Sequence, residues 1–176
     1  MSEPDPKERP QRDFIEHSRQ YLRAEYLPRI RRCVDELPAE DLWWRPNPVS
    51  NSVGNLLLHL AGNARQWVVS GIGGRPDIRE RDTEFAADGG AEAEDLLAHL
   101  ETTLESVDEV LANLEPQRLG EPIRVQGNDV TVLEAVYHVV EHFSMHVGQI
   151  IYITKLRTGT DLRFYDVTEG VARRNW

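Results

Sequence analysis

The sequence has a single cysteine, no long apolar run and fewer basic than acidic residues. One cysteine, Cys33, excludes an internal disulfide and a zinc site built from several thiolates. No stretch approaches the ~20 apolar residues that a membrane-spanning helix needs. Lys and Arg number 20 against 30 Asp and Glu, and this net charge of −10 argues against a protein that binds nucleic acid or anionic membranes.

The length of 176 residues, with 40% of them hydrophobic, is typical of one folded domain. The first ten residues are charged and rich in proline, and they lack the apolar segment of a signal peptide. The sequence therefore predicts a disordered tail over residues 1–11, a single domain over residues 12–176, and a cytoplasmic location.

Apolar residues recur at helical spacing in four segments of the chain. The predicted helices cover residues 13–37, 53–69, 92–114 and 131–156. Pro28 is expected to kink or split the first helix. Thr131 and Glu134 form a capping box that begins the last helix, and a short hairpin over residues 123–129 precedes it. This pattern, with short connections and little strand signal, predicts an all-α four-helix bundle.

The connecting segments carry three further expectations. Trp43 and Trp44 lie in a proline-rich loop, where they either cover an edge of the core or line a pocket. Residues 75–91 form the longest predicted loop, and loops of that length are functional or mobile. The C-terminal tail ends in Trp176 and is expected to pack back onto the bundle.

Histidines are concentrated on the last predicted helix. His138, His142 and His146 are spaced at i, i+4 and i+8, so they share one face about a turn apart. A pair of this spacing can direct two imidazole nitrogens at one metal ion, as in helical His-x-x-x-His sites. Two ligands are too few for zinc, so a third has to come from another segment.

The second predicted helix offers His59 inside an otherwise apolar run, where a histidine is costly unless its nitrogens find partners. Asn55 and Asn63 flank it at the same spacing, and they form a polar stripe. The last helix has a matching stripe that ends at Gln149. Two facing polar stripes predict a metal site inside the bundle; the alternative is a set of core histidines that hydrogen-bond to one another.

Three neutral imidazoles leave one coordination position open, which is typical of catalytic rather than structural zinc, and nickel and iron accept the same ligands. The other candidates are weaker. His17 and His99 lie off the apolar stripes of their helices and are expected at the surface. Cys33 is expected to be a small core residue. Ser144 lies near the histidine face, but no Asp-paired histidine supports a hydrolase triad.

Four segments together resemble the DinB-like superfamily of bacterial four-helix-bundle proteins, and the resemblance runs from about Asp13 to Leu156. These segments are LWWRPN (42–47), NSVGNLLLHLAGN (51–63), RERDTEF (79–85) and HFSMHVGQ (142–149). Each segment alone is a modest signal, whereas their order and spacing together are specific.

The resemblance implies a three-histidine metal site of His59, His142 and His146, with zinc or nickel as the ion and a homodimer as the assembly. His138 lies outside this triad, either as a mere neighbour or as a group that supports the ligands or contacts substrate. The better-known relatives that it resembles are metal-dependent S-transferases or isomerases that use a low-molecular-weight thiol such as bacillithiol, mycothiol or glutathione. In such an enzyme Arg81 would contact a carboxylate of the thiol from a pocket rim, the alternative being a solvated loop.

Two hypotheses follow. The first is an enzyme that transfers a low-molecular-weight thiol to a small electrophilic substrate, with Asn55, Asn63 and Gln149 orienting substrate or ligands, unless they only hydrogen-bond between helices. The second is a non-catalytic bundle in which the metal stabilises an interaction or sensor module. An open coordination position favours the first hypothesis, and a closed four-coordinate metal favours the second.

Overall fold

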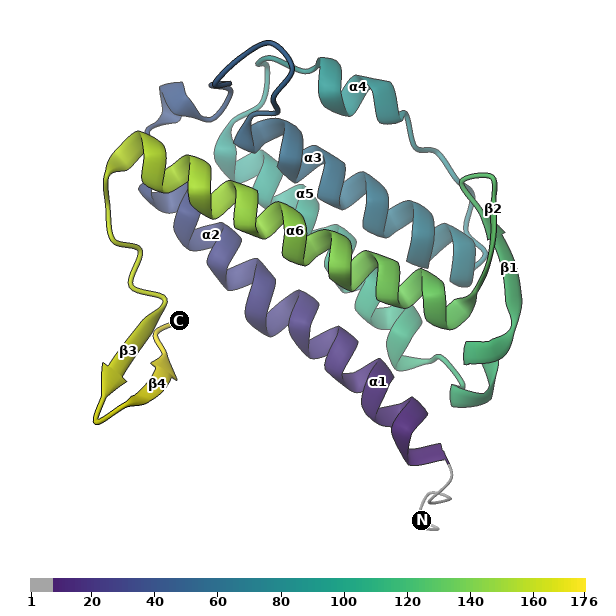
Figure 1. The fold of residues 1–176 in the computed structure, drawn as a ribbon. Helices are drawn as coiled ribbons and strands as arrows, with labels where there is room; N and C mark the ends of the chain where they lie inside the picture. Colours follow the sequence, from purple (N-terminus) through teal and green to yellow (C-terminus); the bar gives the residue numbers. More distant parts are fainter. Residues whose placement is uncertain (1–7) are drawn as a thin grey trace.

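We describe residues 8–176 of the chain in a computed structural model, which is mostly helical and carries two small antiparallel hairpins (Figure 1). Residues 1–7 of the predicted tail lie outside the described residues. The first helix, α1, already begins at Arg9, so residues 9–11 form a helical turn where the sequence predicted disorder. None of the helices described here is both long and apolar enough to cross a membrane.

The first helical rod runs without interruption from α1 (Arg9–Gln20) through a π-helical stretch, η2 (Tyr21–Tyr26), into α2 (Leu27–Glu36). Pro28 lies in the first turn of α2 and has no N–H for the carbonyl of Ala24, four residues earlier. The indole Nε1–H of Trp176 donates to that carbonyl at 2.8 Å. The predicted break is therefore a local widening of the helix, and the freed carbonyl helps to hold the C-terminal tail.

Three more rods complete the bundle in the described part of the chain. They are α3 (Val53–Ala64) with its π-helical extension η4 (Arg65–Ile72), α5 (Ala93–Ala112) and α6 (Val132–Thr158). Capping boxes begin both α3, at Ser52 and Asn55, and α6, at Thr131 and Glu134. Gly159 ends α6 in a left-handed conformation with φ of 66°.

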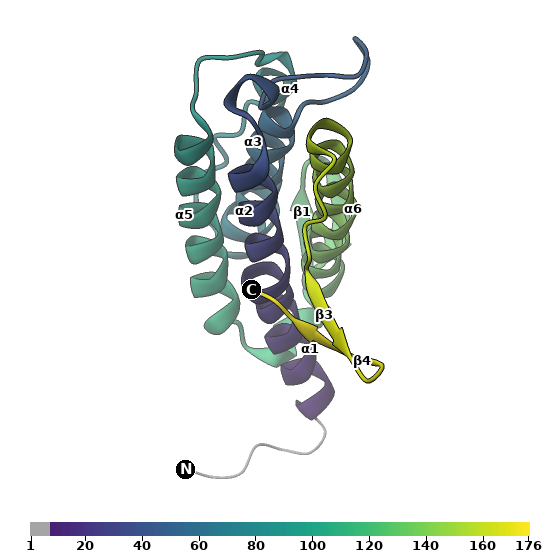
Figure 2. The same cartoon turned by 90° about the vertical axis from the view of Figure 1, so that its left-hand side faces the viewer.

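The rods form a closed ring in which α1 contacts α5, α5 contacts α3, α3 contacts α6 and α6 contacts α2. Figure 2 shows α5 and α6 on opposite sides of the bundle, with the first rod and α3 between them. The core is mostly aliphatic, as the stripes predicted. Its largest fully buried side chains are Phe143, Leu22, Ile30, Leu56, Leu57, Leu60, Leu97, Leu100, Leu104, Leu111, Ile150 and Val53.

The predicted hairpin before the last helix is present. Strand β1 (Pro122–Val125) pairs with β2 (Asn128–Thr131), and Val125 lies opposite Asn128. Gln126 and Gly127 make the turn with φ of 52° and 80°, a two-residue geometry for which glycine is preferred. A second hairpin, β3 (Tyr165–Thr168) with β4 (Val171–Arg174), lies in the C-terminal tail.

The segment predicted as the longest loop contains a short helix, α4 (Arg81–Ala86), which contacts α3. Two side chains hold the carbonyl groups at its C-terminal end. The amide Nδ2 of Asn55 donates to the carbonyls of Glu84 and Ala87 at 2.8 and 2.7 Å. The Arg45 guanidinium donates to Phe85 and Ala87. Sequence periodicity missed α4 because it spans fewer than two turns and tertiary hydrogen bonds hold it in place.

The expected exposure of His17 and His99 and the expected burial of Cys33 are confirmed. Trp43 and Trp44 are half-buried against the edge of the core, and the Trp43 ring lies so close to Gly54 that a Cβ there would meet it at 2.8 Å.

Candidate metal centre

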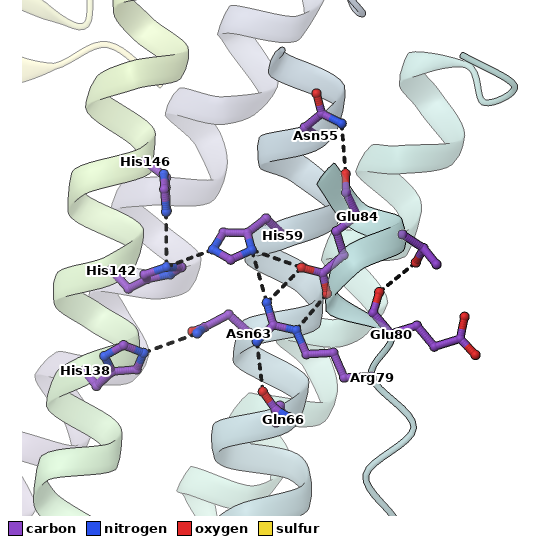
Figure 3. A network of polar contacts seen from close by, with 11 residues as sticks. Asn55, His59, Asn63, Gln66, Arg79, Glu80, Glu84, His138, His142 and His146 are labelled. Carbon is purple, nitrogen blue, oxygen red and sulfur yellow. Dashed lines mark hydrogen bonds and ion pairs between the residues drawn. The ribbon is translucent and has the colours of Figure 1, made fainter. Parts of the chain in front are cut away.

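Three histidine side chains from two helices meet between α3 and α6. Nε2 of His142 lies 3.0 Å from Nε2 of His59 and 3.1 Å from Nε2 of His146. The three residues are buried, with exposed fractions of 6%, 9% and 7% for His59, His142 and His146, respectively. Figure 3 shows the three rings directed toward one another from the two helices.

The outward nitrogens of two of these rings have acceptors that fix their protons. Nδ1 of His59 lies 3.0 Å from the carboxylate of Glu84, and Nδ1 of His146 lies 2.7 Å from Oε1 of Gln149. A carboxylate only accepts, so the neutral ring of His59 carries its proton on Nδ1. The same tautomer follows for His146 from the Gln149 oxygen. Both rings therefore present Nε2 lone pairs to the centre.

Hydrogen bonding alone does not satisfy this arrangement. The Nε2 atom of His142 is a donor or an acceptor, but not both, and it faces two nitrogens that are both acceptors. At least one buried lone pair is therefore left without a good partner, which is costly. In the described residues Nδ1 of His142 has no hydrogen-bond partner either. A cation at the centre would satisfy all three Nε2 lone pairs at once.

A buried ion pair supports His59 from behind. The Arg79 guanidinium binds both oxygens of Glu84, with Nε to Oε1 at 2.7 Å and Nη2 to Oε2 at 2.8 Å. The side chains are only 3% and 9% exposed for Arg79 and Glu84, respectively. Arg79 also donates to Gln66, as Figure 3 shows. Nη2 lies 3.1 Å from Nδ1 of His59 as well, but its closer acceptor is the carboxylate.

A glycine on α3 makes room for this carboxylate. A Cβ at Gly62 would lie 2.0 Å from Oε1 of Glu84, a distance at which the carboxylate must move. Gly62 is three residues after His59, so the glycine and this histidine share a helix face. The sequence therefore allows an acidic side chain from α4 to reach the histidine.

The protonation states favour metal binding at neutral pH. Burial, together with the neighbouring His146 and His59, lowers the pKa of His142 to about 3. Burial also lowers the pKa of His146. Burial opposes ionisation of Glu84, but the hydrogen bonds from Arg79 and His59 outweigh it and lower the pKa of this carboxyl. Neutral imidazoles beside an ionised carboxylate are the form that binds a divalent ion.

The residues present fit a divalent transition metal. Nitrogens about 2.0–2.1 Å from one ion at coordination angles near 90–110° lie about 2.8–3.4 Å apart. The two Nε2 separations of 3.0 and 3.1 Å fall in this range. A carboxylate–histidine pair such as Glu84–His59 is the usual outer support of a metal-bound imidazole.

Residues 10–171 match a protein family described as "Protein of unknown function (DUF1572)". The chain belongs to the DUF1572 family. Its fold is similar to a crystal structure described as a conserved protein from Enterococcus faecalis, with a TM-score of 0.67 and 18% sequence identity. The match covers 82% of this chain and 97% of that chain. No curated protein matches the chain.

A fourth histidine of this DUF1572 chain, the half-buried His138, has a different environment. The His138 ring packs on Trp67 with centroids 4.0 Å apart, and its Nε2 lies 3.2 Å from the amide nitrogen of Asn63. Burial lowers the pKa of His138. His138 therefore contacts an amide and an indole, and it does not join the three converging nitrogens.

The structure places the other predicted residues at different distances from the centre. Gln149 contacts a histidine of the triad directly, whereas Asn55 caps α3 and holds α4. Asn63 contacts His138. Arg81 is exposed, and its guanidinium lies over the Phe85 ring at 4.8 Å. That ring in turn packs on His59 with centroids 4.6 Å apart.

Sequence reasoning missed Glu84 and Arg79, which lie in the charged segment 79–85 where only Arg81 was singled out. One signal could have pointed to them. A buried His59 needs a polar partner, and Gly62 on the same helix face leaves room for one. Charges in a predicted loop are usually solvated, so the pattern alone does not single out these two residues.

Proposed function

We propose that this DUF1572 chain is a metal-dependent enzyme of the DinB-like superfamily that transfers a low-molecular-weight thiol to an electrophilic small molecule. The ligands are His59, His142 and His146. The superfamily assignment rests on the four sequence segments that resemble it, and the mostly helical fold and the position of the three histidines are compatible with it.

One observation carries the proposal. In residues 8–176, three imidazole nitrogens converge, and no carboxylate or thiolate joins them as a fourth ligand. Three protein ligands with an open position are typical of a catalytic site, because the open position takes water or substrate. Glu84, the nearest acidic support, faces the opposite nitrogen of His59 and so leaves that position free.

A bound divalent ion would supply the charge that keeps a thiol ionised near neutral pH. The residues of this chain do the rest. The Glu84 carboxylate holds His59 in the tautomer that binds, and Gln149 does the same for His146. In the reaction, the thiol proton goes to solvent, the sulfur bonds to the electrophilic carbon, and the leaving group departs with its bonding electrons.

The test of this reaction is a thiol-consumption assay with zinc-loaded and nickel-loaded protein. The thiols are glutathione, bacillithiol and mycothiol, each with 1-chloro-2,4-dinitrobenzene as the electrophile. We expect the loaded protein to accelerate loss of at least one thiol, and the His142→Ala variant to lose this acceleration. No acceleration with any thiol and a further panel of electrophiles would reject the transferase.

A second candidate is a non-catalytic bundle in which the ion is a structural element. The observation in its favour is that the triad joins α3 to α6 and is more than nine-tenths buried. An ion present at ~1,000 times its dissociation constant would add about 4 kcal/mol to the free energy of unfolding. A chelator that lowers the melting temperature strongly, in a protein without turnover, would favour this second candidate.

The remaining proposals concern partners and location. We propose zinc or nickel as the ion, a homodimer as the assembly, and no binding of nucleic acid or membranes. The net charge of −10 supports the absence of nucleic-acid binding. Exposed apolar side chains near both ends of α6 support self-association, with Leu133, Tyr137 and Leu156 being 42%, 61% and 54% exposed. A cytoplasmic location stays a prediction.

A further inference from the structure

A cavity of about 540 Å³ lies beside the histidine centre, between the loop after Trp44 and the C-terminal half of α6. This volume is within the range of about 300–1,000 Å³ that is typical of small-molecule sites. The side chains that line the cavity are Pro46, Val49, Ser50, Asn51, Leu56, Met145, Gly148, Gln149, Tyr152 and Ile153.

The lining is uncharged. Of the described residues that line the cavity, none has an ionised side chain, although 28% of the whole sequence is charged. Aliphatic, thioether and aromatic groups form most of the wall, and the polar groups are hydroxyls and amides, as at Ser50, Asn51 and Gln149. A charged molecule would lose its hydration here without an ionic partner, whereas an uncharged and largely apolar one would not.

One side chain belongs both to the cavity and to the centre. Gln149 lines the cavity, and its Oε1 accepts the Nδ1–H of His146 at 2.7 Å. Two further lining residues are near neighbours of the ligands along the chain. Leu56 is three residues before His59 on α3, and Met145 directly precedes His146 on α6. A molecule in the cavity therefore lies against the elements that carry all three histidines.

We infer that this cavity binds an uncharged, largely apolar organic molecule and is the subsite for the electrophile. Its role as a substrate subsite rests on the proposed function, whereas the binding itself does not. The low-molecular-weight thiols are strongly polar or charged, so they do not fit this lining and would approach from elsewhere. The reaction thus joins a polar thiol to an apolar acceptor.

Binding is measurable at Met145, which is one of only two methionines in the sequence. Protein labelled with ¹³C at the methionine methyl groups gives at most two signals, and Met145 is one of the residues that line the cavity. The probes are 2-naphthol, which is neutral at pH 7, and 2-naphthoate, which has the same ring system and a negative charge. We expect 2-naphthol to shift the Met145 signal saturably, and 2-naphthoate to bind at least about tenfold more weakly.

A matched pair of variants locates the site. A Cβ added at Gly148 meets no heavy atom within 4 Å, so larger side chains are accommodated there without a clash at that atom. Gly148→Phe fills the cavity and Gly148→Ala leaves it open, and both replace a helical glycine by a better helix former. We expect Gly148→Phe to abolish the Met145 shift, and Gly148→Ala to keep it, with both melting temperatures at or above that of the unmodified protein.

The inference is overturned if 2-naphthol causes no saturable shift, if 2-naphthoate binds equally well, or if Gly148→Phe keeps the shift. These outcomes are separate from those of the proposed function, because the titration is run on metal-free as well as metal-loaded protein. If 2-naphthol binds but the protein takes up no stoichiometric metal, the cavity is supported as a binding site and the metal-dependent enzyme is rejected. If the protein takes up stoichiometric metal but 2-naphthol does not bind, the metal site is supported and the cavity is rejected as a binding site.

Discussion

His138 and His142 lie one turn apart on α6, both with a lowered pKa, yet they have different surroundings. His142 faces two other imidazole nitrogens at 3.0 and 3.1 Å. His138 faces an amide and packs on an indole ring. The difference comes from the opposite helix, α3, where His59 faces His142 and Asn63 faces His138. Helical spacing therefore shows that the two histidines share a face of α6. The side chain opposite each histidine decides whether that histidine can serve as a metal ligand.

The largest expected effect breaks this comparison directly. The His142→Ala substitution removes the nitrogen that faces both other histidines of the triad, so we expect loss of stoichiometric metal. The His138→Ala substitution removes a ring outside the triad, so we expect metal content to stay unchanged. Elemental analysis of protein purified by one protocol measures both. Equal loss in the two variants, or no loss in either, would show that the distinction between the two histidines is wrong.

A smaller effect sharpens the role of the support behind His59. The Glu84→Gln substitution removes the charge that fixes the Nδ1 proton and pairs with Arg79. We expect metal affinity to fall about 10–100-fold, the usual cost of losing an outer-shell partner. Competition with a chelator of known affinity measures the loss. The matched control is Glu80→Gln, in the same segment but exposed, and a fall of similar size there would contradict the assignment.

The N-terminal end of α6 tests whether the centre depends on the stability of the helix that carries it. Thr131→Ala removes the cap that accepts the Glu134 N–H at 3.2 Å, and we expect a loss of about 1 kcal/mol in the free energy of unfolding. Since the cap lies nearer to His138 than to His142 and His146, metal content should not change. Denaturant unfolding with parallel elemental analysis checks this, and loss of metal would show that the end of the helix controls the centre.

The smallest effect lies away from both histidines. Hydrogen bonds from Arg19 lower the pKa of Asp108, burial opposes this, and Arg23 adds to the lowering. Since the folded pKa lies below the ordinary value near 3.9, the pair stabilises the fold above that pH, and the contribution is lost as pH falls through the folded pKa. We expect Asp108→Asn to cost about 0.2–1 kcal/mol at pH 7 in this partly exposed pair.

Unfolding measured at pH 7 and at pH 2.5 checks this prediction. We expect the difference between Asp108→Asn and the unmodified protein to shrink at the lower pH. A difference that persists unchanged would show that the carboxylate charge is not its source. The metal content at pH 7 should be the same in both proteins.

The helices could be predicted because each has a local signal. Thr131 and Glu134 mark the start of α6, and the apolar stripe of α5 marks its buried face. The hairpin before α6 has a glycine turn. Local signals do not predict α4, because its carbonyl groups are held by hydrogen bonds from the distant side chains of Asn55 and Arg45. They also miss the π-helical passage before Pro28, which keeps the first rod continuous.

The three converging histidines could be predicted from spacing and resemblance, but the residues behind them could not. His59 stands out as the polar residue of an apolar run, and Gln149 continues the stripe of α6. Glu84 and Arg79 reach the centre only because α4 folds against Gly62, a contact between segments that sequence spacing does not encode. Arg81 has the same charge as Arg79 two residues away, so the sequence alone does not separate them.

X-ray absorption at the metal edge of the protein as purified tests the central claim most directly. The account predicts stoichiometric zinc or nickel with three imidazole nitrogens at about 2.0–2.1 Å, and a further light-atom ligand in the open position. A metal-free protein that takes up no zinc or nickel would contradict it, and so would a spectrum without imidazole scattering.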